Sequence, residues 1–188
     1  MAATSVGCGS SSGGTASVAQ TKSATSTVKA STATNPNAFG EISLTSTAFQ
    51  NGHPLPATYT CSGANISPPL RWSKLPADAK ELVFVALDIR KGGRNKVAWS
   101  FAGVKPSDAQ IAAGTLPPGA VLGQNQTGKD KWGGVCGAKG ERHRVAFLIY
   151  ALRRKLNLKP GFDPIAIRPR LKAATISTGL TLASYTHP

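Results

Sequence analysis

Acidic residues are scarce in this chain: 8 Asp and Glu stand against 22 Lys and Arg, which gives a net charge of +14. This excess says nothing about the fold, but it favours anionic partners such as phosphate groups, membrane surfaces, nucleic acids or acidic proteins. A basic surface without a dedicated partner is the alternative. The sequence also lacks any run of 18 apolar residues, so we expect no segment of it to span a membrane.

Cysteines are also few, and the three that occur are Cys8, Cys61 and Cys136. Neither a Cys-x-x-Cys motif nor a cluster of cysteine with histidine is present, so we expect no metal site. Cys61 and Cys136 form either a disulfide or two buried free thiols. A disulfide is favoured if the protein is exported, because such bonds persist in oxidising compartments.

Residues 1–37 lack acidic and aromatic side chains and consist almost wholly of Ala, Ser, Thr and Gly. Such a segment buries too little apolar surface to offset the entropy cost of ordering, so we predict a disordered tether. Around Cys8 the sequence resembles the end of a bacterial lipoprotein signal peptide. It lacks the basic start and the apolar core of such a peptide, and Ser5 stands where an aliphatic residue is usual.

Two readings of Cys8 therefore stay open. It is either a lipidation site, in a gene whose start codon lies further upstream, or an ordinary tail cysteine. The first reading predicts an exported protein, as a cell-envelope lipoprotein or a secreted one, and limits membrane association to a lipid anchor. An N-terminus as written predicts a cytoplasmic protein.

Residues 38–188 have the patterning of one β-rich domain. Two continuous apolar runs, 81–88 and 144–152, are typical of strands covered on both faces. Residues 106–140 are glycine-rich and predicted mostly as loop, and prolines divide 155–172 into short helical pieces. The predicted strands are 39–46, a short one at Trp72, 81–88, 97–104, 144–152 and 175–185. We therefore predict a mainly β fold with minor α: a two-sheet antiparallel β-sandwich with short C-terminal helices.

Several motifs follow one another along this domain. Residues 59–63 read Tyr-Thr-Cys-Ser-Gly, and residues 66–72 read Ile-Ser-Pro-Pro-Leu-Arg-Trp. Residues 132–140 read Trp-Gly-Gly-Val-Cys-Gly-Ala-Lys-Gly, and His143 and Arg144 follow. In this order, the motifs resemble those of the phosphatidylethanolamine-binding protein family, in its bacterial Raf kinase inhibitor-like (YbhB/YbcL) branch. The resemblance covers about residues 38–188.

The resemblance implies that family's sandwich and a small anion-binding pocket. The residues that it assigns to the pocket are Asp88, Trp132, Gly133, Gly134, His143, Arg144 and Tyr185. A glycine-rich turn presents backbone N–H groups to an anion, and a buried carboxylate orients an imidazole. Each assignment has a structural alternative: turn geometry for Asp88 and the glycines, a core hydrogen bond for His143, and a buried ion pair for Arg144.

The chain also departs from the family pattern in its pocket. Arg90 stands in place of a second aspartate, and Ala98 in place of a histidine. Val145 replaces a tyrosine, and Ser62 replaces an aspartate. Two interpretations follow: either Arg90 supplies new contacts to an anion, or the pocket has lost its ligand.

The leading hypothesis is a non-enzymatic module without a cofactor, which binds a small anion or a phospholipid head group. The family resemblance also implies a protein partner, with a protease- or kinase-inhibitor-like role for this chain. Whether the protein forms a homodimer stays open. A hydrolase that uses Ser67, His143 and Asp88 is one alternative, but no serine has the surroundings of a nucleophile elbow. A second alternative is that the protein binds nucleic acid. Only the net charge supports this hypothesis, because the sequence has no recognition motif, so we expect no nucleic-acid partner.

Overall fold

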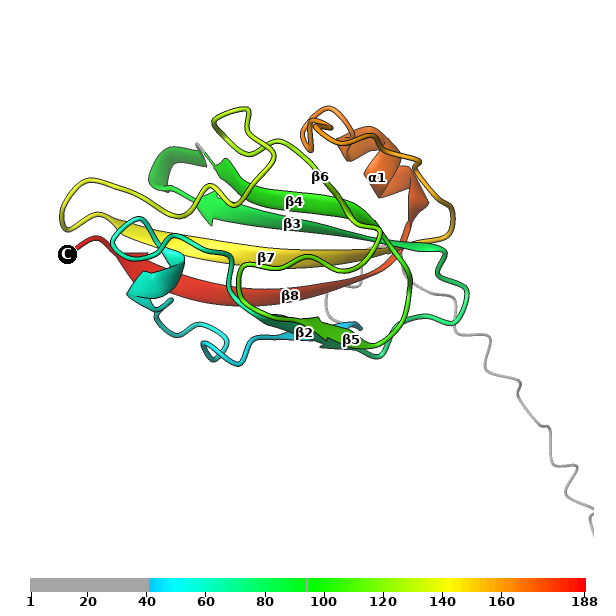
Figure 1. Ribbon diagram of the computed structural model, residues 1–188, viewed down its shortest axis with the longest axis horizontal. Coiled ribbons are helices and arrows are strands. Elements are labelled where there is room, and N and C mark those ends of the chain that lie inside the picture. Colours follow the sequence, from blue (N-terminus) through cyan, green and yellow to red (C-terminus); the bar gives the residue numbers. More distant parts are fainter. Residues whose placement is uncertain (1–40, 94) are drawn as a thin grey trace, which may run out of the picture. The chain divides into compact units, whose positions relative to one another are not determined.

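The computed structural model describes residues 41–93 and 95–188. The predicted tether (1–37), Cys8 and the first three residues of the predicted domain lie outside these ranges. Within them the chain forms eight strands, one α-helix and two short 3-10 helices, arranged as in Figure 1. The 3-10 helices are η1 (Ala57–Tyr59) and η2 (Lys91–Gly93).

The larger sheet has five antiparallel strands in the order β6-β4-β3-β7-β8. Their bounds are β3 Glu81–Ile89, β4 Lys96–Val104, β6 Val121–Leu122, β7 Arg142–Leu152 and β8 Thr175–Thr186. β3 lies at the centre because its apolar run is buried on both faces, as a central strand requires. It pairs with β7 without interruption, from Glu81 opposite Leu152 to Ile89 opposite Arg144.

The smaller sheet has three antiparallel strands in the order β1-β2-β5. Their bounds are β1 Ser43–Thr45, β2 Leu70–Ser73 and β5 Ala109–Ile111. In β2, Leu70 and Trp72 are buried while Arg71 is exposed, which is the alternation of a strand with one face on the core. The Trp72 indole N–H donates to the carbonyl of Ser107, at 2.9 Å.

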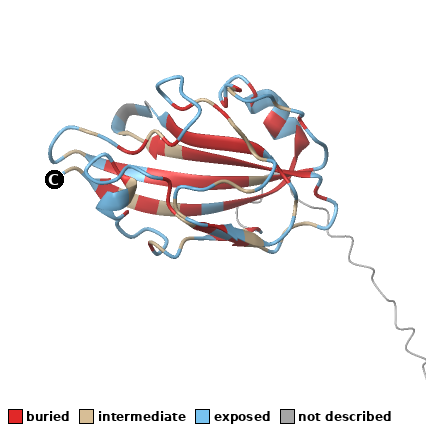
Figure 2. Ribbon diagram, in the orientation of Figure 1, coloured by how far each residue is buried: buried red, intermediate tan, exposed pale blue. Residues whose placement is uncertain are grey.

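The core between the two sheets is rich in aromatic rings. The Phe84 ring lies between those of Trp72 and Phe101, with ring centroids 4.9 and 4.5 Å away. Trp99 continues this series from Phe101, with centroids 4.5 Å apart. Figure 2 shows the strands of the larger sheet buried along most of their length. These rings are almost completely removed from water, so a small number of aromatic residues contributes a large buried apolar area to the core.

A second apolar cluster covers one end of the opposite face of the larger sheet. There the helix α1 (Arg168–Ala174) buries Leu171 and Ala174 in one cluster with Val83 and Val85 of β3. The helix starts with a proline in its first turn, where the missing N–H costs nothing. None of the described helices is long and apolar enough to cross a membrane.

The predicted two-sheet antiparallel sandwich is confirmed, and two details of the prediction are wrong. The first strand is short and begins at Ser43, although the alternating pattern continues before it. Residues 106–140 are mostly loop, as predicted, and also contain β5 and β6, which are three and two residues long. Within the described residues, the segment 155–172 does not form several short helices. It contains only the beginning of one helix, α1, which starts at Arg168.

Candidate functional site

A buried carboxylate lies at the end of β3. Asp88 continues the row of side chains that face the inner core, and only 2% of its surface is exposed. Its Oδ1 accepts a hydrogen bond from Nδ1–H of His143, at 2.8 Å. Its Oδ2 accepts from Nε–H of Arg90, also at 2.8 Å. The carboxylate is therefore paired and hydrogen-bonded on both oxygens, as a buried charge requires.

His143 reaches this centre from β7, where it lies directly opposite Tyr185 of β8. Its side chain has no exposed surface, and its Nε2 has no hydrogen-bond partner among the described residues. The nearest carboxylate oxygen, Oε2 of Glu141, lies 3.5 Å from Nε2. The backbone at Gly137 passes so close to Nε2 that a side chain at 137 would collide with the ring. His143 is thus sealed from solvent, and a ligand cannot contact its ring in this conformation.

Glu141 is part of the same loop. Its Oε2 accepts a hydrogen bond from the Ala138 N–H, at 2.9 Å. This backbone hydrogen bond is the main reason why the pKa of Glu141 lies below its ordinary value of 4.5, and the nearby His143 and Arg90 act in the same direction.

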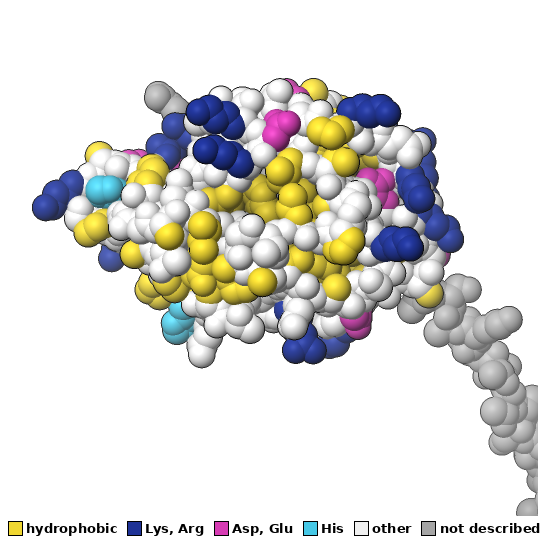
Figure 3. All heavy atoms as spheres, in the orientation of Figure 1, with side chains coloured by type: hydrophobic (Ala, Val, Ile, Leu, Met, Phe, Trp, Pro, Cys, Tyr) yellow, Lys and Arg dark blue, Asp and Glu magenta, His cyan; other side chains and the backbone are white. Residues whose placement is uncertain are grey.

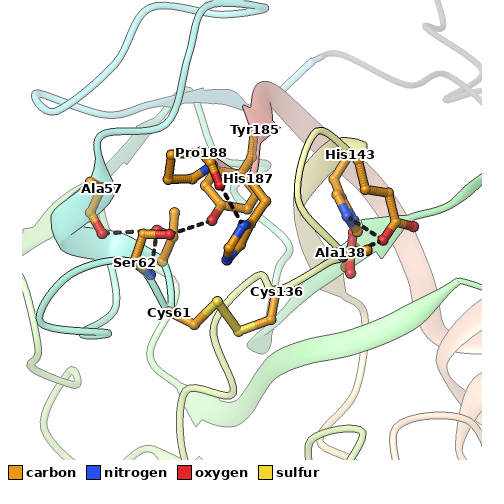
Figure 4. The surroundings of a disulfide bond; sticks show 12 residues. Ala57, Cys61, Ser62, Cys136, Ala138, His143, Tyr185, His187 and Pro188 are labelled. Atoms are coloured by element: carbon orange, nitrogen blue, oxygen red, sulfur yellow. Dashed lines mark hydrogen bonds and ion pairs between the residues drawn. A yellow bond between two sulfur atoms is a disulfide. The ribbon is translucent and has the colours of Figure 1, made fainter.

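Arg90 connects the carboxylate to the loop that carries the second cysteine. Its Nη2 donates to the carbonyl oxygen of Cys136, while its Nε–H donates to Asp88. Cys136 forms a disulfide with Cys61, which is one of the two alternatives that the sequence left open. Near the disulfide, the hydroxyl groups of Ser62 and Tyr185 lie 2.7 Å apart (Figure 4).

The predicted pocket residues do not line one pocket: six of them are divided among three hollows, and Asp88 and Gly134 line none of the three. We call these hollows the basic hollow, the loop hollow and the tryptophan cavity. The basic hollow, of about 700 Å³, is lined by Pro54, Ile89, Arg90, Lys91, Arg142, His143, Arg144, Ser184, Tyr185 and Thr186. The loop hollow, of about 420 Å³, is lined by Arg90, Lys96, Gln126, Thr127, Gly133, Cys136, Gly137, Ala138 and Glu141. The tryptophan cavity, of about 270 Å³, is lined by Asn65, Ile66, Ser67, Trp99, Gly114, Thr115, Leu116, Leu122, Lys131 and Trp132.

The basic hollow takes its shape from the register of β7 and β8. Arg142 lies opposite Thr186, and Arg144 lies opposite Ser184. Because side chains alternate along a strand, both arginines point away from the face that holds the His143 ring. Directly opposite residues have neighbouring side chains, so each arginine has a residue with a hydroxyl group as its neighbour on the next strand. The arrangement can bind an anion with two charged donors and two hydroxyl groups.

Arg142 was missed as a site residue from sequence, and Arg144 was assigned two alternatives. The signal for Arg142 is its spacing of two residues from Arg144 in a strand, which puts both on one face. Arg144 is exposed and forms no ion pair within the described part of the chain, so the buried ion pair considered for it is wrong.

The glycine loop is used for internal contacts. The Gly133 N–H donates to the carbonyl of Ala98, at 2.7 Å, so it is not available to an anion. Gly134 has a φ of 69° and leaves space for the Asn65 side chain, which is the turn role considered for it. Ser67 lines the tryptophan cavity and not the hollow that His143 borders, so the hydrolase residues are not brought together.

The two antiparallel sheets place the chain among the β-sandwich proteins, with charged hollows at the strand ends. A family model for phosphatidylethanolamine-binding protein matches residues 45–186. The chain belongs to the phosphatidylethanolamine-binding protein family.

Two solved structures have the same fold. CT736 of Chlamydia trachomatis, described as a phosphatidylethanolamine-binding protein homologue, has a TM-score of 0.72 and 30% sequence identity. That likeness covers 79% of this chain and 99% of CT736. YbcL of Escherichia coli, described as a member of the mammalian family, has a TM-score of 0.73 and 25% identity, over 79% of this chain and 100% of YbcL.

Relatives by sequence include an archaeal and a mycobacterial protein. The UPF0098 protein of Methanothermobacter thermautotrophicus is 35% identical over 125 residues, which are 64% of this chain and 82% of that protein. The protein named "Putative lipoprotein LppC" of Mycobacterium tuberculosis is 36% identical over 121 residues, 64% of this chain and 60% of LppC. The match therefore spans less than two thirds of the mycobacterial relative.

Proposed function

We propose that this domain is a non-catalytic binding module that takes a phosphate-ester anion, such as a phospholipid head group, in the basic hollow. The observation that carries the proposal is the charge of the lining. Four basic side chains, Arg90, Lys91, Arg142 and Arg144, line this hollow, and no carboxylate does.

Asp88 neutralises only one of these four charges. It pairs with Arg90 from beneath, whereas no acidic partner contacts Arg142, Arg144 or Lys91 among the described residues. Guanidinium groups bind phosphate oxygens through paired, charge-assisted hydrogen bonds. Ser184 and Thr186 add hydroxyl donors on the same face, opposite the two arginines. We place the anion on the outer side of the sheet because Arg142 and Arg144 point there.

Calorimetry tests this proposal with inorganic phosphate, phosphoethanolamine and vesicles of anionic phospholipid as three separate titrants. We expect the double variant Arg142→Gln, Arg144→Gln to bind at least about tenfold more weakly, since each loses a charged hydrogen bond. Lys96→Gln removes one charge from the loop hollow and serves as the matched control, with unchanged affinity. Equal binding by the double variant and the wild type would overturn the proposal. Binding of vesicles but not of phosphate would identify the lipid as the source of the anion.

We further propose that the domain is held near a membrane surface by a lipid on Cys8, which lies outside the described residues. The lipoprotein-like sequence around Cys8 and the name of LppC support this proposal. Sequencing the gene upstream of Met1 tests it: an in-frame basic and apolar segment is the expected result, and a stop codon without such a segment contradicts it. An inhibitor-like role toward a protease or kinase stays a prediction.

A further inference from the structure

The tryptophan cavity shares no lining residue with the basic hollow or the loop hollow. Its walls are apolar, formed by the rings of Trp99 and Trp132 together with Ile66, Leu116 and Leu122. The two indole rings meet edge to face, with centroids 5.9 Å apart. Figure 3 looks onto the face that carries the segment between β5 and β6, and hydrophobic side chains gather in the middle of this face.

One polar atom at this cavity is buried without a partner. The indole Nε1 of Trp132 has no hydrogen-bond partner among residues 41–93 and 95–188. Ser67, which lines the same cavity, is only 4% exposed, and its carbonyl accepts from the Gly114 N–H at 2.9 Å. Buried polar groups are usually hydrogen-bonded, and the exceptions need an explanation. Ser67 also follows Ile66, which is an exposed large apolar side chain at 37%.

The remaining polar lining gives the charge of the ligand. Asn65 and Thr115 are neutral, Lys131 is the cation of the cavity, and no carboxylate lines it. A ligand with one negative charge and an apolar body matches this composition, while a doubly charged phosphate matches the basic hollow better. At about 30 Å³ per water-sized group, the volume holds roughly nine or ten non-hydrogen atoms.

We propose that the tryptophan cavity is a second ligand site, which binds a small amphiphilic carboxylate. The apolar chain lies between the two indole rings on one side and the leucines on the other. The carboxylate accepts from the Trp132 indole N–H and the Ser67 hydroxyl and faces Lys131. This site is independent of the proposed phosphate site, because the two share no residue.

Titration with octanoate tests the proposal on the full chain, read out by tryptophan fluorescence and by ¹H–¹⁵N chemical shifts. We expect saturable quenching, with shifts at residues that line the cavity. Ser67→Ala weakens binding about 3- to 10-fold through the lost hydrogen bond. Lys131→Gln weakens it as well, and the neutral analogue octanol binds more weakly than octanoate.

Two controls make the result specific. Ser177 has a buried hydroxyl without a partner in the described residues, but it does not line the cavity. Ser177→Ala therefore keeps full affinity for octanoate, as does Arg144→Gln in the basic hollow. Absence of saturable binding overturns the proposal, and so does equal affinity of Ser67→Ala and the wild type. Shifts confined to the basic hollow would also contradict the proposal for the tryptophan cavity, but they would not contradict the proposed phosphate site.

Discussion

Asp88 is the residue on which the organisation of this end of the domain depends. It is buried, and it holds His143 on one oxygen and Arg90 on the other. Arg90 in turn reaches the carbonyl of Cys136. A single carboxylate therefore connects β3, β7 and the disulfide loop, and this explains why an arginine is tolerated two residues after it.

Substitution of Asp88 by asparagine removes the charge and keeps the shape. We expect Asp88→Asn to lower the free energy of unfolding by about 3 kcal/mol, because it leaves a partly buried guanidinium without its counter-ion. Chemical denaturation measures the change. The control is Asp78→Asn at an exposed position, where we expect less than about 0.5 kcal/mol. A loss no larger than that of the control would show that the Asp88 network contributes nothing to stability.

Glu141 gives a pH dependence whose sign follows from its pKa, which lies below the ordinary value of 4.5 in the folded state. A carboxyl group with a lowered folded pKa stabilises the fold at higher pH and loses this contribution as the pH falls through the folded pKa. The stability difference between wild type and Glu141→Gln should thus be larger at pH 7 than at pH 3. Denaturation curves at the two pH values check it, and a difference that grows toward pH 3 would contradict the account.

At the scale of the elements, the long strands are readable from the sequence and the short ones are not. β3, β4, β7 and β8 carry apolar runs long enough to define a strand, and their predicted bounds agree with the structure within two residues. β5 and β6 have three and two residues, too few for any period to be visible. They form strands because they pair with the edges of β2 and β4, and such pairing depends on the tertiary structure rather than on the local sequence.

One buried acid connects two strands and the segment between β7 and α1. Glu81 at the start of β3 accepts from the Gly103 N–H at 2.9 Å and from the Leu156 N–H at 2.6 Å. It thereby joins β4 and the segment that leads to α1. Two buried backbone donors are satisfied by its two oxygens.

Glutamine at this position has only one acceptor oxygen. We expect Glu81→Gln to cost about 1–3 kcal/mol, because one buried backbone N–H loses its partner and faces another donor. Thermal unfolding followed by circular dichroism measures the cost. Glu41→Gln, at an exposed residue, is the comparison variant. If both variants melt at the same temperature, the Glu81 contacts do not stabilise the domain.

At the scale of the whole molecule, the disulfide constrains the chain covalently over a long range. Cys61 and Cys136 are separated by 75 residues, so the bond closes a large loop of the unfolded chain. Removal of such a bond typically costs about 2–5 kcal/mol. We expect the double variant Cys61→Ser, Cys136→Ser to lose stability in this range in urea, and to match the reduced wild type. Unchanged stability would exclude a structural role for the bond.

The candidate site was predictable only in part. The motifs identified Asp88 and His143, which do meet, because both lie at inward positions at the ends of neighbouring strands. The division into three hollows was not predictable, since it depends on how the loop between β6 and β7 returns across β4. The contribution of Arg142 depends on the pairing of β7 with β8, which motif matching does not consider.

The charge of the molecule is consistent with the proposed ligand. The net charge of +14 raises the local concentration of anions, but it does not select a site. Selection comes from the exposed arginines of the basic hollow, and because they are exposed, salt should weaken the interaction.

The most direct measurement is the mapping of ¹H–¹⁵N chemical shifts during a titration of the full chain with phosphoethanolamine. The account predicts saturable shifts at Arg142, Arg144, Ser184 and Thr186, which disappear in the Arg142→Gln, Arg144→Gln variant. Shifts that are absent, or that concentrate at Gly133 and Gly137 of the loop hollow, would contradict it.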